Sequence, residues 1–96
     1  TRKGIALNDL KRYEEAIQVY DQAIQLDPSD AFAYTRKGIA LNDLKRYEEA
    51  IQAYDQAIQL DPSSALAYNN KGNALQNLKR DKEAHIAFEK AKELGY

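Results

Sequence analysis

The stretch TRKGIALNDLKRYEEAIQ at residues 1–18 occurs a second time at residues 35–52. The duplication extends beyond this stretch, because residues 1–30 and residues 35–64 are identical at 28 of 30 positions. The two differences are Val19/Ala53 and Asp30/Ser64. Such a close internal copy indicates that the chain is built from repeated units.

A third copy is more divergent, and residues 65–96 agree with residues 31–62 at 15 of 32 positions. The offset between copies is 34 residues throughout. We therefore interpret the chain as a single array over residues 1–96. Its three repeats are residues 1–30, 31–64 and 65–96.

The composition is that of a small globular domain. A chain of 96 residues forms one domain, and 44% hydrophobic with 30% charged residues is typical of a soluble protein. A net charge of −1 attracts neither nucleic acid nor a membrane surface. The absence of cysteine excludes disulfides, zinc–thiolate sites and thiol catalysis. With no membrane-length apolar run and no signal-like segment, we expect a cytoplasmic protein.

Within each repeat, small and apolar residues recur every three or four positions, which is the spacing of a helix. The middle repeat interrupts this pattern twice, at Lys45-Arg46 and at residues 61–64. Because Pro62 cannot continue a helix and disfavours helical geometry in the residue before it, a helix should end at Asp61. Each repeat is predicted to hold two antiparallel helices of about 14 residues, roughly 21 Å long. The chain should then contain six helices and no strand.

Polar residues that favour helix starts follow each predicted helix end. Ser63 or Ser64 can cap the helix that opens the third repeat. Ser29 or Asp30 can cap the helix that opens the second repeat. The repeat boundaries thus carry both a stop signal and a start signal.

Gly4, Gly38 and Gly72 lie in the middle of predicted helices, where glycine costs about 1 kcal/mol relative to alanine. This cost suggests that a side chain cannot be accommodated there. We expect the partner helix to approach closely and to face each glycine with another small residue. The facing residues expected are Ala16, Ala50 and Ala84.

Eight positions of the middle repeat match the pattern of a known family. They are Tyr34, Gly38, Leu41, Tyr47, Ala50, Tyr54, Ala57 and Pro62. Their spacing resembles the tetratricopeptide repeat (TPR), and the resemblance covers the whole chain. It implies an all-α fold, a right-handed superhelical solenoid of three helix–turn–helix repeats.

The sequence departs from the family pattern in two ways. Lys3, Lys37 and Lys71 stand where the family usually has leucine, so their stems are expected to pack while the ammonium groups reach water. In the third repeat, Asp81 replaces the tyrosine and Tyr96 replaces the proline.

The two ends of the array differ. No equivalent of Ala31–Tyr34 precedes Thr1, so the first repeat is interpreted as truncated and the chain as an excised or engineered piece of a longer array. In the third repeat, His85 and Lys92 replace isoleucines that should face a following repeat. A terminal repeat needs such a polar outer face, so the third repeat is interpreted as a C-terminal cap.

Residues that support catalysis do not converge in the sequence. His85 is the only histidine, and we interpret it as a solvated residue of the cap. The acidic pairs Glu14-Glu15 and Glu48-Glu49 are adjacent on a helix and point in different directions. There is no glycine-rich phosphate loop and no basic stripe beside exposed aromatic residues. We therefore predict no enzyme activity, no cofactor, no metal site and no nucleic-acid partner.

The resemblance to TPR arrays implies that the first helix of each repeat lines a concave groove, which binds a peptide segment of another protein. A spacing of three or four residues places the candidates on one helical face. The predicted groove residues are Arg2, Ile5 and Asn8 in the first repeat, Phe32, Thr35, Arg36, Ile39 and Asn42 in the second, and Leu66, Asn69, Asn70, Asn73, Gln76 and Asn77 in the third.

The residue types of the groove suggest the chemistry of its ligand. Arg36 offers a rigid fork for a carboxylate, and the asparagines can each donate and accept hydrogen bonds with an extended backbone. Phe32 and Ile39 would take apolar side chains. The expected partner is a peptide with acidic and apolar residues.

The chaperone-tail class of TPR needs a carboxylate clamp of lysine, asparagine and arginine. The matching positions are Thr1, Ile5, Arg36, Leu66 and Asn70, and none carries the clamp residue. That class of partner is therefore not expected.

Three other interpretations of this surface and chain stay open at this point. The groove face can be a solvated polar face without a ligand. The chain can be a self-assembling structural module or an engineered repeat model, which the near-identity of two copies favours. A weak homodimer through the N-terminal edge is also expected, with Ala6, Leu7 and Leu10 contributing apolar surface.

Overall fold

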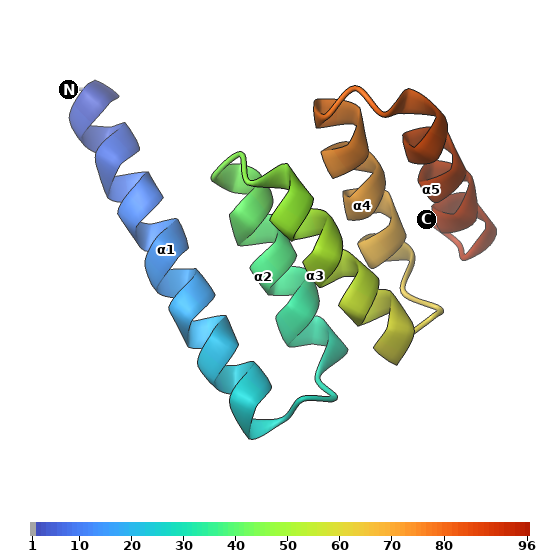
Figure 1. Ribbon diagram of the computed structural model, residues 1–96, viewed down its shortest axis with the longest axis horizontal. Helices are drawn as coiled ribbons and strands as arrows, with labels where there is room; N and C mark the ends of the chain where they lie inside the picture. The colour runs from blue at the N-terminus through green and yellow to red at the C-terminus, as the bar shows by residue number, and fades with distance from the viewer. Residues whose placement is uncertain (1) are drawn as a thin grey trace.

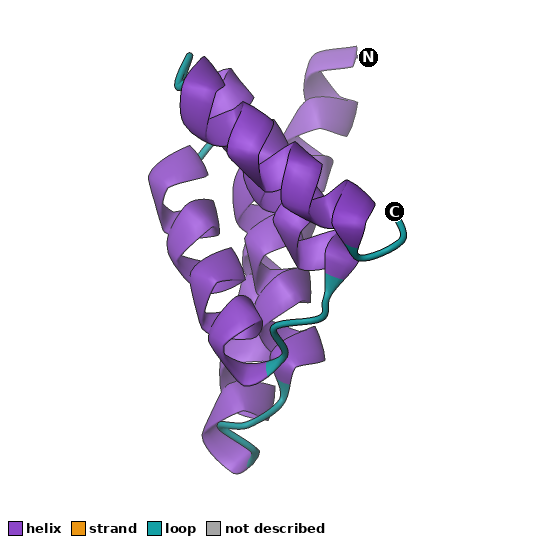
Figure 2. Ribbon diagram, turned by 90° about the vertical axis from the view of Figure 1, so that its right-hand side faces the viewer, coloured by secondary structure: helices purple, strands orange, loops and turns teal. Residues whose placement is uncertain are grey.

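The computed structural model describes the backbone of residues 2–96 and the side chains of residues 12–96. This part of the chain consists of helices and short loops, without a strand (Figure 2). The five helices are α1 (Arg2–Leu26), α2 (Ala31–Asp43), α3 (Tyr47–Leu60), α4 (Ala65–Asn77) and α5 (Asp81–Glu93).

The helices stack in the order of the chain. Figure 1 shows α1, then the α2–α3 pair, then the α4–α5 pair, with the two termini at opposite ends. Each helix contacts the next one in sequence, and α2 also contacts α4. Stacked helix pairs are the arrangement that the 34-residue period predicts.

The starts of α2 and α4 are capped by side chains. The Asp30 carboxylate accepts a hydrogen bond from the backbone N–H of Ala33 at 3.3 Å, and the Ser64 hydroxyl accepts one from Ala67 at the same distance. The prediction is confirmed, with Asp30 and Ser64 as the capping residues. The predicted end of a helix at Asp61 is also confirmed, because α3 ends at Leu60.

Replacing Ser64 by alanine should lower the free energy of unfolding by about 1 kcal/mol, because the N–H of Ala67 loses its acceptor. Ser63 is a matched control, since its hydroxyl donates to the Asp61 carboxylate at 2.7 Å and caps no helix. Urea unfolding of Ser64→Ala and Ser63→Ala measures both effects. Equal losses in the two variants would contradict the assignment of the cap.

Two glycines lie under aromatic rings. A Cβ added to Gly38 would lie 2.7 Å from Cδ1 of Tyr54, and one added to Gly72 would lie 2.7 Å from Cδ1 of Phe88. The predicted close approach at these glycines is confirmed, but the expected facing residue is wrong. The alanine expected there lies one helical turn before the aromatic residue, and the ring atoms are the nearest to the added Cβ. Gly4 lies outside the residues whose side chains are described.

The buried residues form one core that spans the second and third repeats. Tyr54 and Leu75 are its largest fully buried side chains, each 1% exposed. Because residues of α2, α3, α4 and α5 share this core, the two repeats stabilise each other. The cluster is Leu41, Ala50, Ile51, Ala53, Tyr54, Ala74, Leu75, Ala84 and Ala87.

The outer face of α5 carries both polar and apolar side chains. His85 and Lys92 are exposed, while Ala84 and Ala91 are each 1% exposed and face inward. Ile86 was not among the predicted surface residues, and it is exposed where the other repeats have glutamine.

The first repeat departs from the prediction, because α1 continues where a turn was expected. The sequence NDLKRYEE occurs at residues 8–15, inside α1, and again at residues 42–49, where α2 ends and α3 begins. One octapeptide therefore has two conformations in the same molecule. The prediction of six helices is wrong, since residues 2–96 form five.

The physical reason lies in the cost of the turn. Lys45 has a φ of 63°, and a left-handed conformation costs a side-chain-bearing residue about 1–2 kcal/mol. Packing of the two helices on each other can offset that cost. A continuous helix avoids that cost, because each residue of α1 keeps a right-handed helical conformation.

Candidate functional site

The candidate groove is the surface of α2 and α4, which are in direct contact and carry the predicted groove residues of the second and third repeats. On α2, the side chain of Phe32 is 61% exposed. The guanidinium carbon of Arg36 lies 4.7 Å from the centre of the Phe32 ring, a cation–π contact between residues one turn apart. The stacking holds Arg36 at the surface with its N–H donors available.

Two other predicted residues of α2 are less accessible. Thr35 is 5% exposed, and its hydroxyl donates to the carbonyl oxygen of Ala31 at 3.1 Å. Ile39 is partly buried and packs against the core. The hydroxyl of Thr35 is therefore already paired within the helix. The side chain of Ile39 packs against the core beneath the groove surface.

On α4, the predicted residues divide by exposure. Leu66 occupies the position of Phe32 one repeat later and is 44% exposed. Asn69 and Asn70 are partly buried, whereas three further amides lie exposed along the helix. The exposed amides are those of Asn73, Gln76 and Asn77.

Two amide groups of the candidate groove lack a hydrogen-bond partner. Among the side chains described, the buried polar atoms without a partner are Oδ1 of Asn42 and Nδ2 of Asn70. Leaving such an atom unpaired costs about 1–3 kcal/mol. One atom is an acceptor and the other is a donor, so each residue has one hydrogen-bonding capacity that is unused.

Charge in the candidate groove is sparse. Arg36 is the only cation among the predicted groove residues with described side chains. Asp43 follows at the end of α2, and partial burial raises the pKa of its carboxyl. Burial raises the pKa of the Tyr54 hydroxyl, and the charge of Asp43 raises it further. The surface therefore offers one cation, one anion and a series of neutral amides.

Three predicted groove residues belong to the first repeat. Arg2, Ile5 and Asn8 lie outside the residues whose side chains are described.

Two cavities lie elsewhere, and none of the predicted groove residues lines them. The first, of 640 Å³, lies between α1, α2 and α3. The second, of 390 Å³, lies between α4 and α5. Several of their lining residues are equivalent, 34 positions apart, namely Tyr34/Tyr68, Lys37/Lys71, Leu41/Leu75, Glu49/Glu83 and Ala53/Ala87.

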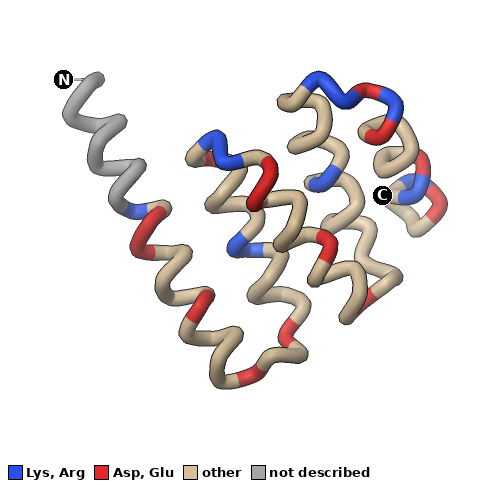
Figure 3. The backbone as a smooth tube through the Cα atoms, in the orientation of Figure 1, with Lys and Arg blue, Asp and Glu red and all other residues tan. Residues whose placement is uncertain are grey.

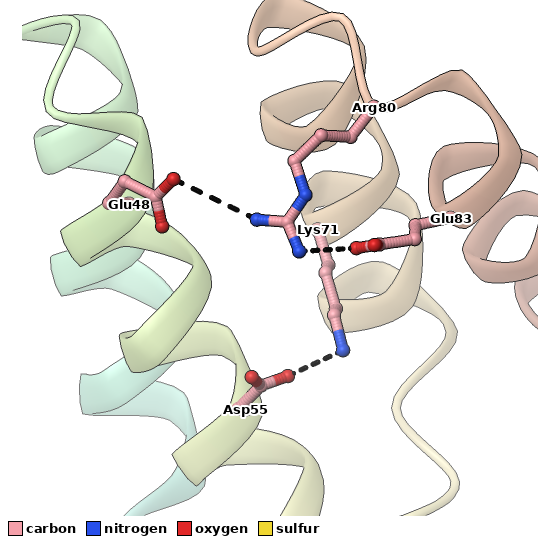
Figure 4. Close-up of polar contacts among 5 residues, drawn as sticks. All are labelled: Glu48, Asp55, Lys71, Arg80 and Glu83. Atoms are coloured by element: carbon pink, nitrogen blue, oxygen red, sulfur yellow. Dashed lines mark hydrogen bonds and ion pairs between the residues drawn. The ribbon is translucent and has the colours of Figure 1, made fainter.

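The lysines at the leucine positions of the family pair with the preceding repeat. Nζ of Lys37 lies 2.7 Å from the Asp21 carboxylate, and Nζ of Lys71 lies 2.7 Å from that of Asp55 (Figure 4). Both lysine side chains stay partly exposed, so these ion pairs lie at the surface, and the pairing itself was not predicted. Both partners recur with the 34-residue period, so the sequence held a signal for the pairing. Partly exposed pairs of this kind contribute about 0–1 kcal/mol each.

A second set of charges joins α3 to α5. Nη2 of Arg80 lies 2.5 Å from the Glu83 carboxylate, and Nη1 lies 3.7 Å from that of Glu48 (Figure 4). Figure 3 shows basic residues gathered at the loops between α2 and α3 and between α4 and α5. The basic residues of these two loops thus lie just after the C-terminal ends of α2 and α4.

Within the described part of the chain, no three histidine, cysteine, aspartate or glutamate residues cluster as a metal site would require. None of the helices described combines the length and the apolar character needed to traverse a lipid bilayer.

The chain matches models of two described protein families. Residues 4–44 and 38–79 match a family described as TPR repeat, and residues 65–94 match one described as tetratricopeptide repeat. The matched residues agree with the predicted resemblance. Among curated protein sequences, none matches the chain.

Solved structures of TPR domains match the whole fold. The second TPR of Spaghetti (RPAP3), bound to the HSP90 peptide SRMEEVD, has a TM-score of 0.84 and 31% identity, over 97% of this chain and 86% of that one. The TPR2B domain of yeast Sti1 in a pHsp70 complex has a TM-score of 0.85 and 28% identity, over 88% and 67%. These matches confirm the predicted all-α solenoid.

A third similar structure is larger. MamA has a TM-score of 0.83 and 30% identity, over 86% of this chain and 48% of that one. The chain therefore spans about half the length of MamA.

Proposed function

The chain belongs to the tetratricopeptide repeat family, and we propose that it is a non-catalytic scaffold that holds a peptide segment of another protein. The binding surface is the groove along α2 and α4. The observation that carries this proposal is the exposed face shared by the two contacting helices, with Phe32, Arg36 and Leu66 at the surface.

Several features support a peptide as the ligand. Extended peptides present backbone donors and acceptors at regular intervals, and exposed amides can pair with both. Asn73, Gln76 and Asn77 are exposed on α4, and the unpaired amide groups of Asn42 and Asn70 lie on the same predicted face. The structural similarity to TPR domains solved with bound peptides supports the same role.

The chemistry of the groove narrows the class of peptide. Arg36 would pair with a single carboxylate, and Phe32 with Leu66 would contact apolar side chains. The peptide SRMEEVD, which is bound in the Spaghetti structure, is rich in acidic residues. With Arg36 as the one cation on the described part of the groove, we expect SRMEEVD to bind more weakly than peptides selected for this surface.

Selection from a library of random short peptides tests the proposal. The selected peptides should contain acidic and apolar residues, and Arg36→Ala should weaken their binding about fivefold, which corresponds to about 1 kcal/mol. The weakening should shrink as salt rises, because exposed charges are screened. Calorimetry at low and high salt measures both effects.

Arg46→Ala is the matched control for this experiment. It removes the same charge from an exposed position that pairs with Glu49 and lies outside the groove. Its affinity for the selected peptides should equal that of the unmodified protein. A library that yields no peptide, or equal losses in Arg36→Ala and Arg46→Ala, would argue against a groove on α2 and α4.

The alternative function is self-assembly as a structural module or engineered repeat without a ligand, favoured by the near-identity of two repeats. In either case we predict a weak homodimer through the N-terminal edge, with Kd in about the micromolar range or weaker. Ala6, Leu7 and Leu10 lie outside the described side chains. Sedimentation at rising concentration measures the dimer, and a chain that stays monomeric at the highest soluble concentration would contradict it.

The division into repeats of residues 1–30, 31–64 and 65–96 stays a prediction, as does a cytoplasmic location. Unfolding of variants in each repeat would test the division.

A further inference from the structure

The second half of α1 has a helical face that is less covered than its equivalent in α3. Ala50, Tyr54 and Ala57 are 0–1% exposed. Their equivalents in α1 are identical residues 34 positions earlier, and each is partly exposed. These equivalents are Ala16, Tyr20 and Ala23. In the second repeat the helix that covers this face is α2, the first helix of the same repeat.

The first repeat contains the residues that such a covering helix needs. Gly38 receives the ring of Tyr54, and the first repeat has Gly4 and Tyr20 at the same two positions. Within residues 1–30 the two differences from the second repeat are Val19 and Asp30, neither of which lies in the turn. Nothing in the sequence of the first repeat excludes the folded-back arrangement.

The turn itself is formed twice in the same molecule. Lys45 and Lys79 have φ values of 63° and 61°, and the N–H of Arg46 and that of Arg80 each donate to a carbonyl five residues earlier at 2.9 Å. Residues 8–15 repeat the sequence of residues 42–49 without a change. The octapeptide is therefore competent for both the helix and the turn.

We propose that the continuous helix α1 and a helix–turn–helix hairpin are two conformations of the first repeat. In the hairpin, residues 2–10 fold back onto the face of α1 formed by Ala16, Tyr20 and Ala23. Since α2 contacts α4, the repeat relation places residues 2–10 against α2. The hairpin then adds Arg2, Ile5 and Asn8 to the groove.

A peptide in the groove would favour the hairpin, because the hairpin offers it a third helix to contact. A ligand shifts such an equilibrium by its difference in affinity for the two states. This coupling rests on the proposed peptide-binding function. The existence of the two conformations does not rest on that function. The coupling and the conformational equilibrium can therefore be tested separately.

The distance between residues 3 and 22 distinguishes the conformations. In a continuous helix, 19 residues separate the two sites by about 28 Å. The equivalent residues Lys37 and Gln56 line the same cavity in the hairpin of the second repeat. The chain has no cysteine, so Lys3→Cys with Gln22→Cys allows specific spin labelling. The pair Lys37→Cys with Gln56→Cys gives the reference distance of a hairpin.

Lys11→Gly shifts the equilibrium without a ligand. Glycine adopts the left-handed turn conformation without steric cost and disfavours the helix, so the ratio of hairpin to helix should rise roughly thirtyfold. Dipolar spectroscopy of labels at residues 3 and 22 should show a larger fraction of molecules with the short distance in Lys11→Gly. A selected peptide should raise the same fraction in the protein that keeps Lys11.

Either of two results would overturn the proposal. One is a distribution of label distances that is the same in the Lys11→Gly variant as in the protein with Lys11, whether the distance is long or short. The other is a short distance that disappears when labelled chain is mixed with an excess of unlabelled chain, because residues 2–10 would then be covering a second copy. If the peptide selection fails, the Lys11→Gly comparison still decides, so failure of the proposed function and failure of this inference are distinguishable.

Discussion

Gly38→Leu should lower the free energy of unfolding by about 3 kcal/mol, because the new side chain overlaps the ring of Tyr54. A Cβ alone would lie 2.7 Å from Cδ1 of that ring. Tyr54 is fully buried, so the ring cannot move aside without disturbing the core that the second and third repeats share. The midpoint of urea unfolding measures the loss, and a loss below about 0.5 kcal/mol would show that the contact is not tight.

Gly38→Ala provides a sharper control. Alanine is favoured over glycine inside a helix by about 1 kcal/mol, so an unconstrained site would be stabilised by this change. At Gly38 we expect alanine to destabilise the protein instead, because its Cβ would overlap the ring of Tyr54. In a Tyr54→Ala background the same change should become stabilising, because the ring is gone. A double-mutant cycle of Gly38→Ala and Tyr54→Ala isolates the contact.

Leu75→Ala should also cost about 3 kcal/mol, within the range found for buried leucines. Leu75 is 1% exposed and belongs to the core that joins the second and third repeats. Removal of its side chain leaves a cavity among α3, α4 and α5. Urea unfolding measures the effect.

Leu66→Ala is the matched control for Leu75→Ala, since Leu66 lies on the same helix and is 44% exposed. We expect its stability to change by less than about 0.5 kcal/mol, while the affinity for selected peptides falls. Equal losses of stability in the two variants would contradict the separation of groove and core on α4.

The parts of the fold that local sequence determines could be predicted. Pro62 ends a helix through steric exclusion, and Ser64 caps the next one through a single hydrogen bond. Both effects act over a few residues, so the sequence alone was sufficient. The partner of Gly38 required three-dimensional packing, because Ala50 and Tyr54 lie one turn apart on the same face and spacing does not say which reaches the glycine.

The conformation of the first repeat could not be predicted from local sequence. Residues 8–15 and 42–49 are identical and yet form a helix in one place and a turn in the other. The difference comes from the packing available to each copy, which is a property of the whole repeat. For the groove, the sequence indicated the helical face, but the burial of Thr35 depends on the packing around α2, which spacing along one helix does not give.

The most direct test of the central claim is amide chemical-shift mapping with a selected peptide. A peptide held along α2 and α4 should produce its largest changes at Arg36 and Asn70, in both backbone and side-chain signals. Gln52 and Gln56, which line the cavity between α1, α2 and α3, should be unaffected. The largest changes at Gln52 and Gln56, with none at Arg36 and Asn70, would contradict the proposed groove.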